Sequence, residues 1–339
     1  MPKRTWSHGD LEEVTVCPAC GSTKRTAAEW RRRDNDGLFP DVWQFVQCAA
    51  CLSLYLASRP TVESIGHAYA SYYTHGTGGS TVSTEMGKSL LPLIHGYLRL
   101  RFGLRREPAW VAAGSVFYLI EPLRLKLDYY GRHLPRKPGS VFDVGCGNGD
   151  FLLRAQQMGW HVGGCDPDPV AVEAANRLGL NAVCGFPEDV LRPDAEWDVI
   201  TLGHVIEHVA HPLDLLRLCH GALKGGGRLW LATPNAQAVG LKYLGKCWIH
   251  LHPPNHFCIL HPDALRSLLE RAGFSRVRFM RRGLQSPAQW RIAREICTRE
   301  GCEIPPAKLH LARWLSDIRA TFTTDVAEEI VVIADKPCA

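Results

Sequence analysis

The sequence predicts an α/β domain with a mostly parallel sheet, and three stretches of the chain carry that prediction. The apolar run 141–144 is followed by three alternate glycines and an apolar helical pattern, which is typical of a strand, a tight turn and a helix start. The stretches 160–166 and 197–202 are predicted as two further buried strands. Two pairs of cysteines before residue 60 predict a small separate module in front of this domain.

The glycine turn, formed by Gly145, Gly147 and Gly149, predicts a binding site for a nucleotide-like ligand. Such a turn requires backbone angles that a Cβ resists, and it lets a ligand lie against the main chain. A dinucleotide fingerprint would require glycine at position 150, where Asp150 stands, so the spacing disfavours NAD. Asp143 at the strand end suits a ligand with an ammonium group better than one with a pyrophosphate.

This turn has the form D-x-G-x-G-x-G and resembles the motif of class I S-adenosylmethionine-dependent methyltransferases. The resemblance covers about residues 138–336, because 197–202 and 225–235 also match the fourth and fifth strands of that family. It implies a Rossmann-like sheet of seven strands whose last strand is antiparallel. It also implies S-adenosylmethionine as the cofactor.

The resemblance further implies which residues contact the cofactor. Asp166, about 20 residues after the turn, is expected to accept hydrogen bonds from both ribose hydroxyls. Many family members carry an acid after the third strand for the adenine amino group. Phe186 stands there in this chain, so we expect Phe186 on the ring and Glu188 or Asp189 at the polar edge. The expected cofactor residues are Asp143, Gly145, Cys146, Gly147, Gly149, Asp166, Pro167, Phe186, Glu188 and Gly203.

Histidines gather after the fourth and fifth predicted strands, in 204–208 and 248–257. Methyl transfer to a hydroxyl requires alignment of the acceptor and removal of its proton, and histidine suits the second task near neutral pH. The chain resembles sugar C-methyltransferases that begin with a zinc module, and their acid/base histidines align with His208 and His256. Those enzymes carry Tyr-His-Glu-His in the late loop, where this chain has Pro-Asn-His-Phe at 254–257, so O- and C-methylation both stay open.

The acceptor predicted from this resemblance is a sugar or glycan-related molecule, with a histidine as general base. An alternative is a quinone-type, catechol-type or other small-molecule O-methyltransferase. His204, Glu207 and His208 resemble the Glu-x-x-Glu-His segment of ubiquinone-pathway enzymes, which can hold a divalent ion beside a catechol. An alternative of another class is a non-catalytic adaptor, which the intact glycine turn and Asp166 disfavour.

The cysteines at the amino-terminal end predict a structural zinc site. Cys17, Cys20, Cys48 and Cys51 form two C-x2-C pairs, and four thiolates complete a closed tetrahedral site. We therefore predict a zinc ribbon over residues 1–60. The other nine of the 13 cysteines show no such pairing and are expected in the core.

A helical connector is predicted over 61–137, and the methyltransferase domain over 138–339 with a helical insertion at 286–324. Tyr72, Tyr73 and His75 are expected on an aromatic helix face, followed by a glycine-rich loop. The segment 88–137 includes a 12-residue uncharged stretch, too short to span a bilayer. It is predicted to cap the substrate cleft, with a dimer contact or peripheral membrane contact as alternatives.

Composition limits the remaining possibilities. The formal charge of +5 arises from 39 basic and 34 acidic residues, a balance that does not predict nucleic-acid binding. The first eight residues have no apolar core, so we expect no signal peptide, a cytoplasmic location and no disulfide bonds. The expected partner is a small-molecule or glycan acceptor, and the sequence leaves the oligomeric state open.

Overall fold

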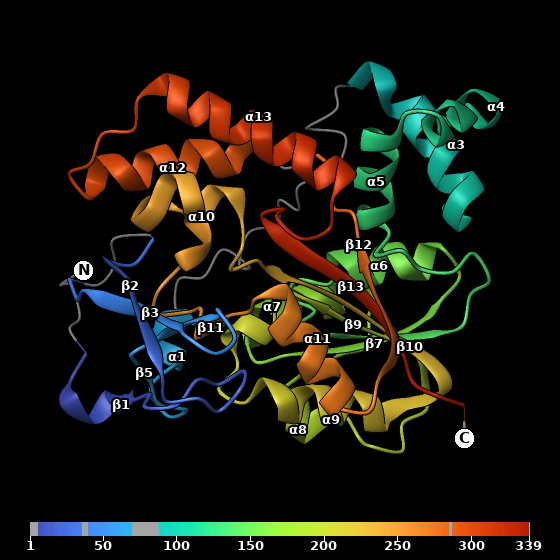
Figure 1. Ribbon diagram of the computed structural model, residues 1–339. Helices are drawn as coiled ribbons and strands as arrows, with labels where there is room; N and C mark the ends of the chain where they lie inside the picture. Colours follow the sequence, from blue (N-terminus) through green and yellow to red (C-terminus); the bar gives the residue numbers. More distant parts are fainter. Residues whose placement is uncertain (1–5, 36–39, 70–87, 285–286, 339) are drawn as a thin grey trace.

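The computed structural model describes residues 6–35, 40–69, 88–284 and 287–338 of the 339-residue chain (Figure 1). The aromatic residues Tyr72, Tyr73 and His75 and the glycine-rich loop that follows them lie outside the described residues.

The larger part of the molecule is built on a seven-stranded sheet in the order β12-β13-β10-β9-β6-β7-β8. Strands β6 to β10 pair in parallel, and β13 lies antiparallel between β10 and β12. The sequence prediction of a Rossmann-like sheet with an antiparallel last strand is thus confirmed. The strands are β6 (Ser140–Val144), β7 (His161–Asp166), β8 (Ala182–Cys184), β9 (Trp197–Gly203), β10 (Leu223–Pro234), β12 (Ser275–Met280) and β13 (Glu329–Asp335).

Helices pack on both faces of this sheet (Figure 1). Amphipathic spacing explains how: α11 buries Leu265, Leu268 and Leu269 in one core with Ile200 and Leu231 of the sheet. The helices are α6 (Asp150–Gln157), α7 (Pro169–Arg177), α8 (Pro187–Val190), α9 (Pro212–Ala222) and α11 (Pro262–Arg271). A short 3-10 turn, η5 (Ile206–His208), follows β9.

The amino-terminal region forms a smaller antiparallel sheet in the order β11-β4-β3-β2. Its strands are β2 (Arg25–Arg32), β3 (Trp43–Cys48), β4 (Leu54–Leu56) and β11 (Cys258–Ile259). β1 (Leu11–Glu13) pairs separately with β5 (Ser58–Pro60), and η1 (His8–Asp10) and α1 (Gly66–Tyr69) flank that pair. Because β11 comes from the larger domain, the small sheet joins residues about 200 positions apart, as in the pair Cys258 and Tyr55.

Two helical regions cover the rest of the molecule on the upper side of Figure 1. The predicted connector contains η3 (Lys88–Leu90), α3 (Leu91–Phe102), α4 (Val111–Gly114), η4 (Ser115–Tyr118) and α5 (Glu121–Tyr130). The predicted insertion contains α12 (Pro287–Arg299) and α13 (Pro306–Phe322). Below it lie α10 (Val239–Leu244), η6 (Gly245–Cys247) and η7 (Ile249–Leu251).

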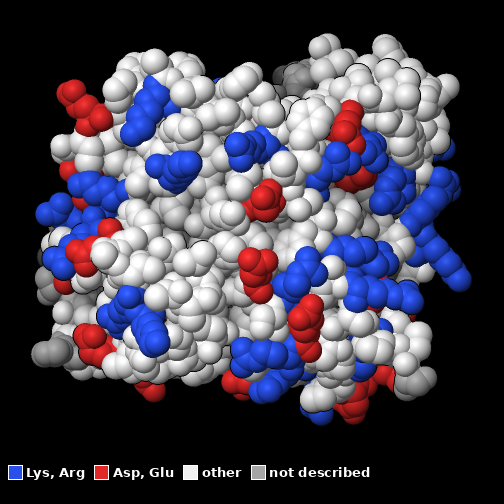
Figure 2. All heavy atoms as spheres, in the orientation of Figure 1, with Lys and Arg blue, Asp and Glu red and all other residues white. Residues whose placement is uncertain are grey.

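The surface of the connector is apolar over its uncharged stretch. Trp110, Tyr118 and Leu119 are exposed there, Leu119 by 86%. Among the described residues, no helix combines the length and hydropathy that crossing a bilayer requires. Acidic and basic side chains are interspersed on the face shown in Figure 2. The roles of this stretch as a cap, a dimer contact or a membrane contact stay predictions.

Candidate active site

The glycine turn lies between β6 and α6, as the sequence predicts. Gly145, Gly147 and Gly149 have φ angles of +69°, +52° and +82°, in the left-handed region that side chains avoid. A Cβ on Gly145 would lie 2.5 Å from Cγ2 of Val205, and one on Gly149 would lie 2.4 Å from Cδ1 of Leu180. Each glycine is therefore required by backbone angle, and the first and last also by close packing.

Asp166 at the end of β7 is held against this turn. Its Oδ2 accepts a hydrogen bond from the Gly147 amide at 2.8 Å, and its Oδ1 accepts one from the Asp168 amide at 2.9 Å. Burial raises the pKa of Asp166, and the two amide donors oppose that rise. The carboxylate is thus fixed at the sheet edge beside the position expected for a ligand. Its contact with a ribose stays a prediction.

Asp143 was expected to meet the ammonium group of a ligand, but in the structure it pairs with Arg132. Oδ1 accepts hydrogen bonds from the guanidinium of Arg132 and from Oγ1 of Thr201, the latter at 2.7 Å. Burial nevertheless raises the pKa of Asp143. Its Oδ2 is buried and has no hydrogen-bond partner. Only that oxygen is left to meet a ligand ammonium group.

Arg132 is a site residue that the sequence analysis missed. Its guanidinium lies 3.9 Å from the centre of the Phe151 ring and 2.9 Å from the position of a Cβ on Gly203. It therefore lies beside two of the expected cofactor residues, Asp143 and Gly203. Its φ of +46° is unusual for a residue with a side chain, and this was not visible in the sequence.

The other expected cofactor residues differ in exposure. Cys146 is buried within the turn, whereas Pro167 and Phe186 are exposed on the loops after β7 and β8, and Glu188 is exposed on α8. Phe186 directly precedes α8 and is 41% exposed, so its ring is accessible to a ligand. Their contacts with a cofactor remain predictions.

His204 lies between two buried carboxylates just after β9. Its Nδ1 is 3.2 Å from Oε1 of Glu207, and its Nε2 is 3.3 Å from Oε1 of Glu329. Glu207 also accepts a hydrogen bond from Oγ1 of Thr233 at 2.9 Å, and Glu329 pairs with the buried guanidinium of Arg282. Glu329 is the first residue of β13, and the sequence analysis did not select it. Its role was missed because an acid at a strand start reveals no partner.

The charges of this network follow from its contacts. Burial opposes a charge on His204, but Tyr129 and the carboxylates of Glu207 and Glu329 outweigh burial and raise its pKa well above the ordinary value. Burial would also raise the pKa of Glu207, but the hydrogen bond and charge of His204 reverse that effect and lower it. His204 is therefore an imidazolium near neutral pH, which makes it a proton donor and unsuited to act as a base.

His208 and His256, one from each histidine segment, lie close together. Their ring centres are 4.7 Å apart, and the Phe257 amide donates to the carbonyl oxygen of Glu207 at 2.6 Å. Nδ1 of His256 lies 2.7 Å from the carbonyl oxygen of His250. Burial lowers the pKa of His208 and lowers that of His256 well below its ordinary value. Both rings are neutral near pH 7.

Glu207, His208 and His256 also offer three ligand atoms within 4.8 Å of one another. One carboxylate and two imidazoles suit a transition metal ion better than magnesium, which prefers oxygen ligands. Both oxygens of Glu207 are already engaged by His204 and Thr233. The donor set is thus present, and each oxygen of Glu207 also takes part in one hydrogen bond within the chain.

The four predicted zinc-binding thiols lie together in the amino-terminal sheet. Sγ of Cys17 lies 3.6 Å from that of Cys51, and Sγ of Cys20 lies 3.5 Å from that of Cys48. A tetrahedron with zinc–sulfur distances of about 2.3 Å has sulfur–sulfur edges of about 3.8 Å. The thiols therefore fit a zinc ion with little movement, and the identity of that ion stays a prediction.

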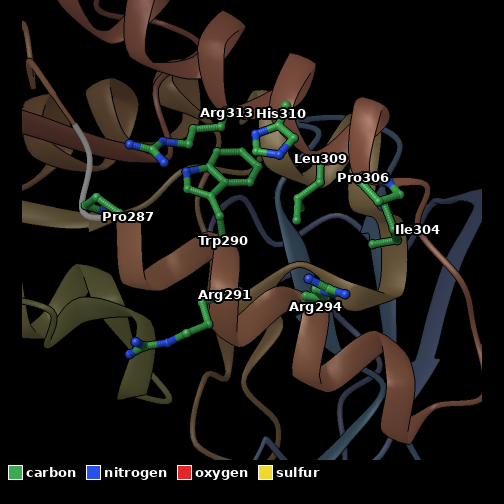
Figure 3. A pocket seen from close by; sticks show the side chains of 9 residues that line it. All are labelled: Pro287, Trp290, Arg291, Arg294, Ile304, Pro306, Leu309, His310 and Arg313. Carbon is green, nitrogen blue, oxygen red and sulfur yellow. The ribbon is translucent and has the colours of Figure 1, made fainter.

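A pocket separate from this site lies between α12 and α13 (Figure 3). It has a volume of about 230 Å³ and carries Arg291, Arg294 and Arg313 around Trp290. None of the glycine-turn, histidine or cysteine residues discussed above lines it. The predicted chemistry therefore belongs to the sheet edge and not to this pocket.

Known proteins with similar sequences are methyltransferases. Residues 117–278 match a family model described as a methyltransferase domain. A ubiquinone biosynthesis O-methyltransferase of Coxiella burnetii is 28% identical over 182 residues, which are 48% of this chain and 75% of that protein. The enzyme of the same name from Xylella fastidiosa is 32% identical over 125 residues, 35% of this chain and 50% of that protein. The chain thus spans half to three quarters of the length of these relatives.

Two solved structures were also similar. A SAM-dependent methyltransferase from Archaeoglobus fulgidus has a TM-score of 0.44 at 19% identity, covering 67% of this chain and 100% of that one. A second, from Mesorhizobium loti, has a TM-score of 0.43 at 18% identity, covering 62% and 98%. The family match over residues 117–278 and the names of these relatives show that this chain is an enzyme that carries an S-adenosylmethionine-dependent methyltransferase domain.

Proposed function

We propose that this enzyme methylates a hydroxyl group of a phenol- or catechol-like small molecule, with His256 as the general base. The names of the curated relatives support the O-methyltransferase alternative of the sequence analysis. They do not support the predicted sugar or glycan acceptor. The nature of the acceptor therefore rests on those relatives, and the choice of base rests on geometry.

The expected cofactor fits the residues at the sheet edge. S-adenosylmethionine supplies a methyl group bonded to a positively charged sulfur. The three glycines with positive φ form the tight turn between β6 and α6, and Asp166 presents a fixed carboxylate beside Gly147. Gly145 and the histidine segment share this edge, because β6 pairs in parallel with β9 and Val205 packs on Gly145. Cofactor and base thus come from adjacent strand ends.

The hydrogen bond from His256 to the carbonyl of His250 is the observation that carries the proposal. A carbonyl oxygen only accepts, so Nδ1 of His256 carries the proton and Nε2 keeps its lone pair. Burial keeps this ring neutral near pH 7, which leaves Nε2 free to take a proton. A base weakened in this way deprotonates a phenol, with a pKa of about 10, far more readily than an aliphatic sugar hydroxyl.

The neighbouring groups have supporting roles in this scheme. His204, as a buried cation, stabilises negative charge that develops near it, and Glu207 and Glu329 hold it in place. His208 packs edge-on against His256 and limits the orientations of that ring. No step requires a metal ion, because both oxygens of Glu207 already accept hydrogen bonds from the chain.

The test is a transfer assay with labelled S-adenosylmethionine, offering catechols, sugar nucleotides and oligosaccharides in parallel. Catechols should be labelled. His256→Gln should slow turnover by about 10²- to 10⁴-fold, as expected for a general base, with S-adenosylhomocysteine affinity unchanged. His310→Gln is the matched control, because His310 is exposed on α13.

Two results would contradict the proposal in different ways. Labelling of sugars alone would restore the glycan acceptor. Catechol labelling that a chelator abolishes, and that Glu207→Gln also removes, would replace the histidine base by a metal centre of Glu207, His208 and His256.

A further inference from the structure

Three cysteines outside the predicted zinc module lie together where the helical insertion packs on η6. The sulfur atoms of Cys247, Cys297 and Cys302 all lie within 4.8 Å of one another. Cys247 is 2% exposed and Cys297 is 1% exposed, while Cys302 is half-buried. Sequence analysis placed them among the nine core cysteines, because they show no C-x2-C spacing and lie up to 55 residues apart.

The end of α12 builds part of this cluster. Gly301 has a φ of +66°, a left-handed angle that turns the chain back on the helix. The Cys302 amide then donates to the carbonyl oxygen of Cys297 at 2.9 Å. This helix cap places the Cys302 thiol over the Cys297 thiol. Cys247 reaches both from η6, which packs against α12.

Two basic side chains, Arg32 and Lys246, lie near the three thiols. The buried guanidinium of Arg32 donates to the carbonyl oxygens of Lys246 and Trp248, on either side of Cys247, at 3.1 and 2.9 Å. Nζ of Lys246 lies 3.5 Å from the carbonyl oxygen of Glu300, next to the end of α12. A buried cation beside a cysteine cluster favours thiolates over thiols.

We propose that Cys247, Cys297 and Cys302 bind a zinc ion as a second site, independent of the amino-terminal one. The three sulfur atoms lie close enough together to bind one ion, and as thiols they make only weak hydrogen bonds. Three thiolates and one zinc ion carry a net charge of −1, which Arg32 offsets. A water molecule would supply the fourth ligand, because Cys302 is half-buried whereas Cys247 and Cys297 are buried.

Such an ion would fix the loop that carries the site histidines. Cys247 and His250 lie three residues apart, and His250 provides the carbonyl that orients His256. α12 packs on both η6 and η7. The zinc ion would thus join the helical insertion to the histidine loop through three thiolate bonds.

Elemental analysis of the full-length protein, purified under reducing conditions, tests the proposal. The protein should contain about two zinc ions per chain, one for each thiolate set. Cys297→Ser with Cys302→Ser should lose about one of them, and Cys17→Ser with Cys20→Ser should lose the other. Cys338→Ser, which removes an exposed cysteine at the carboxyl end, should keep both.

Alkylation of the wild-type protein gives a second readout that needs no folded variant. Cys302 should resist alkylation in the zinc-loaded protein and react after treatment with a strong chelator, whereas Cys338 should react in both. The proposal is overturned if the Cys297 and Cys302 double variant keeps its full zinc content. A disulfide between Cys297 and Cys302 in intact-mass analysis, or a Cys302 that reacts equally with and without chelator, would also overturn it.

Discussion

At the scale of single residues, Asp166 is the most direct test of how the cofactor is held. Its carboxylate is fixed by the amides of Gly147 and Asp168, and we expect it to accept two further bonds from ribose hydroxyls. Asp166→Ala should weaken S-adenosylhomocysteine binding by about 1.5 to 3 kcal/mol or more, as for hydrogen bonds to a charged group. Calorimetry measures this, with Glu173→Gln on the exposed face of α7 as control. Unchanged affinity in Asp166→Ala would remove this residue from the cofactor site.

Residues fixed by their own backbone were predictable, and residues fixed by distant partners were not. The glycines were found because their spacing alone requires unusual φ angles. Arg132 and Glu329 were missed, because each acquires its role from a partner at least 11 residues away, Asp143 and His204 respectively. The prediction for Asp143 named only a ligand ammonium group and missed Arg132 for the same reason.

At the scale of elements, the histidine loop 249–256 couples stability to pH. Burial lowers the pKa of His250 to about 4 and that of His252 to about 3, against about 6.5 when unfolded. As pH falls below 6.5, these two histidines bind protons in the unfolded chain but stay neutral in the folded loop. The free energy of unfolding therefore decreases as pH is lowered from about 6.5 to 4.

The variant His252→Gln isolates this effect. Glutamine does not titrate, so the variant loses the proton that His252 binds in the unfolded chain but not in the folded one. The slope of the unfolding free energy against pH should therefore decrease by up to about 1.4 kcal/mol per pH unit between pH 4 and 6. Denaturant unfolding at several pH values measures the slope, and His310→Gln on exposed α13 should leave it unchanged. His204 acts in the opposite sense, because its raised pKa contributes stability that is present at low pH and lost as pH rises. Equal slopes in wild type and His252→Gln would show that His252 binds its proton equally well in the folded and the unfolded chain.

Elements with a strong sequence pattern were predicted close to their actual bounds. The strands expected over 160–166 and 197–202 are β7 (His161–Asp166) and β9 (Trp197–Gly203), because each is a short apolar run next to turn residues. The strand β11 was not predicted. It has two residues, Cys258 and Ile259, and exists only because β4 pairs with it.

At the scale of the whole molecule, the amino-terminal sheet and the larger domain share both a strand and a core. Cys48 and Tyr55 of the first 60 residues belong to one buried cluster with Leu216 and Leu265 of the larger domain. The Leu56 amide also donates to the carbonyl oxygen of Phe257, directly after His256. The sequence could assign the two regions but not this junction, because pairing between distant segments leaves no local pattern.

This junction predicts that the amino-terminal thiols affect catalysis at a distance. Replacing Cys17 and Cys20 with serine should release one zinc ion and loosen β4, whose partner β11 begins two residues after His256. Turnover should then fall while S-adenosylhomocysteine affinity is retained, because the glycine turn lies on another strand end. Hydrogen exchange should rise in 54–56 and 256–259 and stay constant in β6. Full turnover in a variant that has lost this zinc ion would show that the small sheet does not position His256.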